Sequence, residues 1–120
     1  MAHTLQHQII ARALDIISDR EHWVSGTLAR QSDDSICFWG HPYAYRYCAM
    51  GALARAALEI LGEGCVAKRL TGEVAEHVLE VNNRQFERLP TINDTEGHRV
   101  IVAMFEKGLA TQRHAKGRPL

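Results

Sequence analysis

A chain of 120 residues corresponds to one domain, and it is long enough to bury roughly two thirds of its unfolded surface without a disulfide or metal. Apolar residues make up 46% and charged residues 23%, which excludes intrinsic disorder. The 14 basic and 14 acidic residues cancel, but the last ten residues hold three basic side chains and no acid. The remaining body is mildly acidic, which makes nucleic acid an improbable partner, because affinity for phosphates comes from Lys and Arg.

Two elements are predicted within residues 1–45. The first is an amphipathic helix that Thr4 caps and that runs to about Ser18, because apolar residues recur on one face at helical spacing. Turn-forming residues then mark residues 20–45 as irregular. Within that segment, the short runs 27–30 and 36–39 predict a small β-hairpin, which needs packing against the helices to be stable.

A second helix is predicted over about residues 46–61. It is rich in alanine and apolar on almost every side, which is typical of a central, buried helix. Gly51 lies in its interior, where glycine costs about 1 kcal/mol relative to alanine. With Ala49 and Ala52 beside it, we expect another backbone segment to approach this helix closely at Gly51.

Two further helices complete the predicted fold. Thr71 is a candidate cap for a third helix that runs to about Gln85, with valines at helical spacing on its buried face. After a loop, Asn93 and Glu96 show the three-residue spacing of a capping box. That spacing predicts a fourth helix over residues 94–109.

The expected fold is therefore mainly α, with four helices packed around the Ala-rich second helix and a small β-hairpin between the first two. The pattern predicts a single helical domain over residues 1–110. Residues 111–120 carry Arg113, Lys116 and Arg118, and we expect them to form a basic, flexible C-terminal tail.

Three features of the sequence predict a reduced, cytoplasmic environment. The cysteines Cys37, Cys48 and Cys65 are odd in number and lack the short spacing of a disulfide framework. The start lacks the basic region and apolar core of a signal peptide. No run approaches the 18 apolar residues of a membrane helix, so we expect free thiols, no membrane partner and a cytoplasmic location.

The segment PYAYRYCAMGAL, residues 42–53, is the most distinctive part of the chain. It resembles the Ala-x-Arg-Trp-Cys-Ala-x-Gly-Ala-Leu signature of an uncharacterised bacterial and phage family of small domains. Tyr47 stands where that family often has Trp. The matching residues are Ala44, Arg46, Cys48, Ala49, Gly51, Ala52 and Leu53.

Other parts of the chain fit the same resemblance. The family pattern has an opening amphipathic helix, a Trp with a nearby Gly, an Asn-Asp pair and a closing helix. Trp23 with Gly26 fits the second element, and either Asn82-Asn83 or Asn93-Asp94 fits the pair. The resemblance implies a shared fold and no particular activity, because the family has no established function.

Cys48 is the candidate nucleophile. It is predicted in the first turn of the second helix, where unpaired N–H groups and the helix dipole lower the pKa of a thiol, and Arg46 adds positive charge. A cysteine nucleophile also needs a base and an orienting residue. The candidates are His77 and His98 as the base and Asn82 and Asn93 as the orienting residue. The favoured alternative is that Cys48 is a buried structural residue.

An aromatic cluster is the candidate binding site. Five of the eight Phe, Trp and Tyr residues lie within ten positions, beside Gly40 and Pro42, and such clusters wall ligand pockets or partner-binding faces. The three tyrosines alternate, so an extended segment would place them on one side. The predicted ligand-binding residues are Trp39, His41, Tyr43, Tyr45 and Arg46. The alternative is that these aromatic side chains form a satellite core.

The sequence predicts no metal and no cofactor. Cys37, His41 and Cys48 have three and six residues between them, and the Cys-x-x-Cys pair that is common in structural zinc sites is missing from the sequence. The glycine-rich loops that bind nucleotide phosphates are missing as well.

Three functions remain open at this stage. The leading hypothesis is a non-enzymatic binding or accessory domain that holds a protein or small molecule at residues 38–48, with Arg46 as the polar anchor. The competing hypothesis is a cysteine-dependent hydrolase or transferase that uses Cys48. The third is a homo-oligomer that uses the apolar second helix as its interface.

Overall fold

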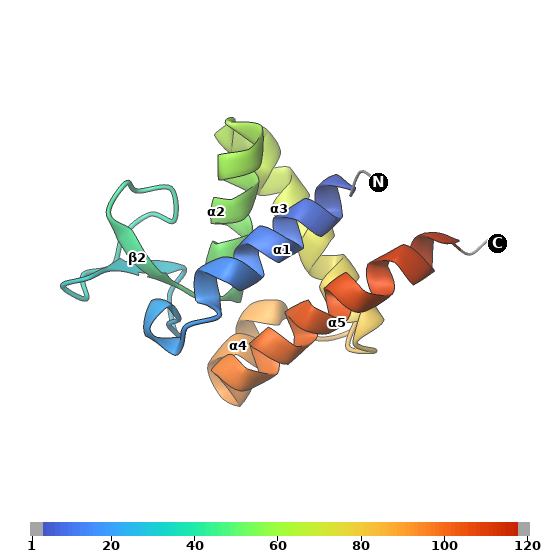
Figure 1. Cartoon of the computed structure of the whole chain (residues 1–120). Coiled ribbons are helices and arrows are strands. Elements are labelled where there is room, and N and C mark those ends of the chain that lie inside the picture. Colours follow the sequence, from blue (N-terminus) through green and yellow to red (C-terminus); the bar gives the residue numbers. More distant parts are fainter. Residues whose placement is uncertain (1–3, 118–120) are drawn as a thin grey trace.

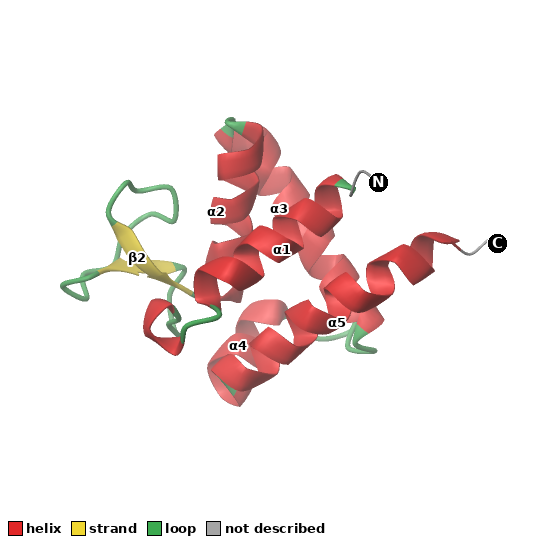
Figure 2. Cartoon of the chain, viewed as in Figure 1, coloured by secondary structure: helices red, strands yellow, loops and turns green. Residues whose placement is uncertain are grey.

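The computed structural model describes residues 4–117, and over that range it contains five α-helices, one 3₁₀-helix and a two-stranded antiparallel sheet (Figures 1 and 2). The elements are α1 (Leu5–Ile17), η1 (Arg20–His22), β1 (Ala29–Gln31), β2 (Ala44–Tyr47), α2 (Ala49–Leu61), α3 (Gly64–Val81), α4 (Leu89–Glu96) and α5 (His98–Gly117). The prediction of a mainly α protein with a small hairpin is confirmed. The predicted number of helices, four, is wrong.

Helix α1 forms as predicted. The Thr4 side chain accepts a hydrogen bond from the backbone N–H of His7 at 3.0 Å, which satisfies one of the unpaired donors at the helix start. Its buried face carries Ile9, Ile10, Ala13 and Ile17. This apolar stripe packs α1 against α2 and α5.

Helix α2 is the central helix, but it begins at Ala49 rather than at residue 46. Arg46 and Tyr47 are paired in β2, and Cys48 is the N-cap with extended backbone. The helix ends at Gly62, whose φ of 75° is in the left-handed region that favours glycine. Its small buried residues allow α1 and α3 to pack against it on two sides (Figure 1).

The close backbone approach expected at Gly51 is confirmed. A Cβ atom placed on Gly51 would lie 2.0 Å from the carbonyl oxygen of Leu28. The same carbonyl accepts a hydrogen bond from the backbone N–H of Cys48 at 3.2 Å. Glycine is therefore needed because the segment before β1 lies directly on the first turn of α2.

Helix α3 begins eight residues earlier than predicted, at Gly64, with Glu63 in the cap position that the sequence assigned to Thr71. Thr71 is not its cap but a buried residue in its interior, and its hydroxyl donates a hydrogen bond to the carbonyl of Ala67 at 2.7 Å. One buried apolar stripe runs from Ala67 through Val74 and Val78. The helix therefore continues through Thr71, although the local preference of threonine is for a helix start.

The predicted fourth helix is two helices, α4 and α5, with a break at Gly97. The φ of 92° and ψ of −179° at Gly97 are accessible essentially to glycine alone, and they end α4. Asn93 lies inside α4, so the predicted capping box is wrong. Helix α5 continues to Gly117 and includes most of the predicted tail, and residues 118–120 lie outside the described residues.

Residues 23–48, here called the excursion, project from the side of the helical body (Figures 1 and 2). Strand β1 pairs with β2, in the register Ala29 opposite Tyr47 and Arg30 opposite Arg46. The predicted pairing of residues 27–30 with 36–39 also exists, as a short bridge between Arg30 and Ile36 on the other side of β1. The predicted hairpin is thus confirmed, and β2 is the partner that the sequence did not reveal.

A pair of glycine variants tests the close contact. Gly51→Ala improves helix propensity, yet its Cβ would overlap the Leu28 carbonyl, so we expect the free energy of unfolding to fall by about 2 kcal/mol or more. Gly72→Ala in α3, where a Cβ meets nothing within 4 Å, is expected to raise it by about 0.5–1 kcal/mol. Urea denaturation measures both, and two stabilised variants would contradict the contact.

Candidate functional site

The excursion is fastened to the helical body by Asn93, a fully buried side chain on α4. Its Oδ1 accepts hydrogen bonds from the indole N–H of Trp23 at 2.8 Å and from the backbone N–H of Ala49 at 2.9 Å. Its Nδ2 donates to the carbonyl of Val24 at 3.1 Å. One amide therefore joins the start of the excursion, the start of α2 and α4.

Asp94 extends this junction to the turn at Gly26. Its Oδ1 accepts from the backbone N–H of Gly26 at 2.9 Å and from Nδ2 of Asn93 at 3.0 Å. Of the two candidate Asn-Asp elements, Asn93-Asp94 is thus the one that contacts Trp23 and Gly26. Asn82 instead caps the end of α3, and its Nδ2 donates to carbonyls of α3 and α5.

Arg55 of α2 forms a second attachment for the excursion. Its Nη1 donates to the carbonyl of His41 at 2.9 Å and to that of Trp39 at 3.3 Å. Its Nε donates to Glu59 at 3.1 Å, which holds the guanidinium in place. The aromatic segment is therefore positioned through its backbone, so its side chains remain available for packing or recognition.

The predicted ligand-binding residues lie in different environments. Trp39 is only 7% exposed and belongs to the core, where its ring lies 4.5 Å from that of Phe38. His41 accepts a hydrogen bond from the backbone N–H of Tyr43, and the Tyr43 side chain is 73% exposed. The satellite-core alternative therefore describes Trp39, whereas Tyr43 has surface to offer a partner.

The side chains of Tyr45 and Arg46, which are consecutive residues of β2, lie next to each other. The Tyr45 hydroxyl donates to Glu21 at 2.8 Å, and this bond raises the pKa of Tyr45. The guanidinium of Arg46 lies 5.2 Å from the Tyr45 ring and 3.7 Å from the Asp34 carboxylate. Tyr45 and Tyr47 both line one recess, whereas Tyr43 lies in the turn before β2, so two of the three alternating tyrosines share a side.

The outer edge of the excursion is its most exposed apolar feature. The N–H of Gln31 donates to the Ser35 carbonyl at 2.8 Å, and the N–H of Cys37 donates to the Ala29 carbonyl at 3.1 Å. In this antiparallel pattern the N–H and C=O of the residue between them, Ile36, point away from β1. Residues 35–38 are here called the 35–38 edge.

The 35–38 edge carries backbone groups and side chains that face solvent. Within the described residues, the N–H and C=O of Ile36 and the N–H of Phe38 have no hydrogen-bond partner. The Ile36 and Phe38 side chains are 65% and 61% exposed. Cys37, between them, packs toward the core. The sequence contained the signal for this edge, because Ile36 and Phe38 alternate with Cys37, but it did not show which side is free.

Cys48 is a buried N-cap. Its side chain is 4% exposed, and its Sγ accepts a hydrogen bond from the N–H of Gly51 at 3.3 Å. Burial raises the pKa of Cys48 and outweighs the backbone donors near the sulfur, which is opposite to the expected direction. In the described part of the chain, no hydrogen bond joins Cys48 to His77 or His98. His98 Nε2 instead lies 2.6 Å from the carbonyl of Ile17.

Comparison with known proteins places the chain by family alone. A family model described as a family of unknown function, DUF6197, matches residues 1–111. The chain belongs to this family. No curated protein and no solved structure matches it. Membership in DUF6197 confirms the expectation of an uncharacterised family and leaves the activity to be inferred from the site.

The described residues were also compared with the requirements of a metal site and of a membrane helix. They contain no cluster of three or more His, Cys, Asp or Glu side chains placed to hold a metal ion. None of the helices described is both long enough and apolar enough to cross a bilayer.

Replacing Asn93 tests the junction. Asn93→Ala leaves the Trp23 indole N–H and the Ala49 N–H without their acceptor, so we expect a loss of about 3 kcal/mol in the free energy of unfolding. Thr95→Ala, an exposed position on the same helix, is the control and is expected to change it by about 0.5 kcal/mol or less. Equal denaturation midpoints for the two variants would refute the junction.

Thiol alkylation followed by peptide mapping tests the state of Cys48. A raised pKa means less thiolate at neutral pH, and burial blocks access, so we expect native protein to be alkylated at exposed Cys65 and not at Cys48. Cys48 should react only after denaturation. Native-state labelling of Cys48 at the rate of Cys65 would contradict this and would favour the cysteine-enzyme hypothesis.

Proposed function

We propose that the protein is a binding module that recognises an extended segment of another protein by strand addition at the 35–38 edge. The observation that carries the proposal is the free edge itself, on which outward N–H and C=O groups of Ile36 and the N–H of Phe38 are combined with two exposed apolar side chains. In strand addition, main-chain hydrogen bonds supply affinity and alternate side chains supply specificity. Both parts are present here.

The composition of the edge supports recognition rather than protection. Exposed strand edges in natural proteins are usually blocked by lysine, proline or a covering segment, because a free edge pairs with other chains. The 35–38 edge has the sequence Ser-Ile-Cys-Phe, without either residue. Ile36 and Phe38 lie two positions apart, so their side chains share one face. The partner is therefore an extended segment with apolar side chains at alternate positions.

Charge beside the edge adds a polar component to the proposed partner. Asp33, in the turn before the edge, accepts hydrogen bonds from the N–H and hydroxyl of Ser35. These bonds lower the pKa of Asp33, so its carboxylate is ionised at neutral pH. We expect a Lys or Arg next to the apolar residues of the bound segment, facing Asp33.

The attachment of the excursion supports binding as well. A two-stranded ribbon is marginally stable by itself, but this one is held by Asn93 at its start and by Arg55 behind the aromatic segment. A positioned edge loses less conformational freedom on binding than a loose loop, which improves affinity.

The other two hypotheses have less support. A cysteine-dependent reaction needs an accessible thiolate, and Cys48 is buried with a raised pKa. An oligomer through the apolar second helix needs that helix on the surface, and the alanines of α2 are buried between α1 and α3. Both arguments favour the binding module.

A peptide selection with a backbone variant tests the proposal. Random peptides displayed on phage are selected on the full chain, and we expect enriched sequences with alternating apolar residues and one flanking Lys or Arg. Ile36→Pro removes the outward N–H without breaking a bond inside the protein, and we expect about ten-fold weaker binding of the enriched peptides. Fluorescence anisotropy measures the Kd.

Ile36→Val is the matched control, because it keeps the N–H and an apolar side chain. It should bind within about three-fold of the original chain, and both variants should keep the same melting temperature. Failure to enrich peptides, or enriched peptides that bind Ile36→Pro equally well, would sink the proposal. Light scattering tests a further outcome. If the original chain self-associates and Ile36→Pro abolishes this association, the bound segment belongs to a second copy of this chain and not to another protein.

A further inference from the structure

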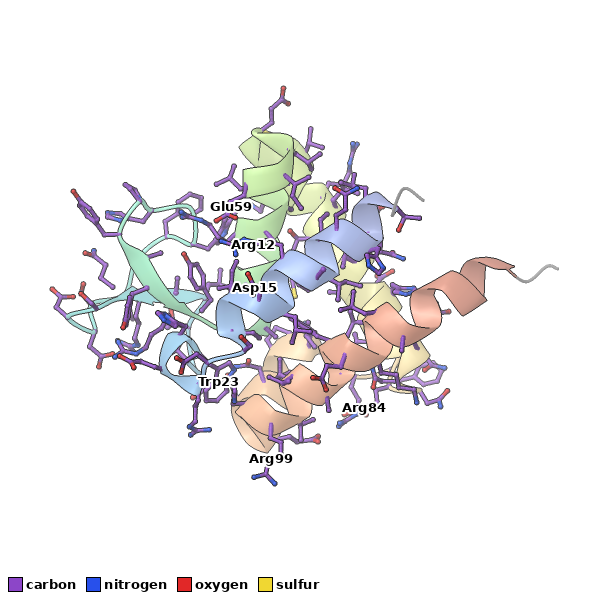
Figure 3. The ribbon with its side chains drawn as sticks, viewed as in Figure 1. Arg12, Asp15, Trp23, Glu59, Arg84 and Arg99 are labelled. Atoms are coloured by element: carbon purple, nitrogen blue, oxygen red, sulfur yellow. The ribbon has the colours of Figure 1, made fainter. Side chains whose placement is uncertain are left out.

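A recess lies where β2 meets α1 and α2, on the β2 side of the excursion. Its volume is about 340 Å³, at the small end of the range for ligand pockets. Figure 3 shows Arg12, Asp15 and Glu59 gathered where α1 passes α2 beside the excursion. His22, Tyr45 and Arg55 also line the recess. The 35–38 edge contributes no residue to it, so the recess is a separate feature.

A chain of ion pairs forms the polar side of the recess. Glu59 accepts from Nε of Arg12 at 2.8 Å and from Nε of Arg55 at 3.1 Å, so both of its oxygens are used. Arg12 also pairs with Asp15 at 2.9 Å. Burial opposes ionisation of Glu59, but the two arginines outweigh it and lower its pKa. The carboxylate therefore stays charged and holds both guanidinium groups against the recess.

The two arginines retain unused donors. Within the described residues, Nη2 of Arg12 and Nη2 of Arg55 have no hydrogen-bond partner. Each arginine therefore offers one free nitrogen, and a carboxylate has two oxygens that can each accept a charge-assisted hydrogen bond from one of them. The two arginines and two acids of the recess cancel in formal charge, so a singly charged anion is favoured over a doubly charged phosphate.

The other residues that line the recess are less polar. The His22 and Tyr45 rings contact each other edge to face, with centroids 4.5 Å apart. Ile16, Ala44 and Tyr47 are the remaining residues of this part of the lining. Such a surface accepts a flat or apolar group of a few atoms, and aromatic pairs of this kind add to the stability of the contact.

We propose that this recess binds a small monocarboxylic acid, with the carboxylate on the free guanidinium donors of Arg12 and Arg55 and an apolar or aromatic body against Tyr45 and His22. The site is independent of strand addition at the 35–38 edge. It uses residues from four elements, and sequence spacing does not bring them together.

Benzoate is the probe, and ¹⁵N-labelled full-length chain is the target. We expect saturable shifts of the amide signals of Arg12, Ile16, Ala44 and Tyr45 at benzoate concentrations on the order of 1–10 mM. Benzamide has the same ring without the charge and should bind about ten-fold more weakly. This comparison needs no variant, so it holds even if a substitution at the recess unfolds the protein.

Arg12→Gln tests the assigned contact, and Arg69→Gln on the exposed face of α3 is its control. We expect about ten-fold weaker benzoate binding for the first and no change for the second. Absence of localised shifts, equal binding of benzamide, or tighter binding of inorganic phosphate than of benzoate would each overturn the proposal. Ile36→Pro changes the 35–38 edge and leaves the recess intact. A negative benzoate titration therefore contradicts the recess proposal alone, and a negative peptide selection contradicts the strand-addition proposal alone.

Discussion

The structure depends on one buried amide, the side chain of Asn93. A buried polar group without partners costs about 1–3 kcal/mol, so this amide is compatible with the core only because both of its ends are used. Its carbonyl oxygen accepts hydrogen bonds from the first backbone N–H of α2, that of Ala49, and from the Trp23 indole N–H, and its NH₂ group donates to the Val24 carbonyl. Three chain segments are therefore held in one relative position by a side chain that acts through hydrogen bonds and not through apolar packing.

That constraint decides which residues of the excursion face solvent. Residues 38–47 contain Trp39, which belongs to the core, and Phe38 and Tyr43, which are exposed. A sheet of this size cannot stand alone, and Arg55 adds a second fixed point by binding two carbonyls of the segment. The exposed 35–38 edge is thus a consequence of how the backbone is attached, and the proposed strand addition would use its free N–H and C=O groups.

Arg55 also links the two proposed binding features. Its Nη1 holds the aromatic segment, and its Nε holds Glu59, which in turn holds Arg12 in the recess. At Cys48, by contrast, two electrostatic effects oppose each other. The helix start favours the thiolate, but burial removes water from the sulfur, and burial dominates. A cysteine at a helix N-terminus is therefore reactive only when it is also accessible.

Periodicity and residue size were enough to predict several features of the helices. The stripe of α1, the Ala-rich α2 and the close approach at Gly51 all follow from periodicity and residue size. The start of α3 and the break at Gly97 did not, because burial and a backbone conformation reserved for glycine overrode local propensity. The two donors that bind the Asn93 carbonyl oxygen lie 70 and 44 positions away, and β1 has pairing partners on both sides. Only the tertiary structure could decide which amide is buried and which strand edge is free, because both depend on contacts between segments that local spacing does not relate.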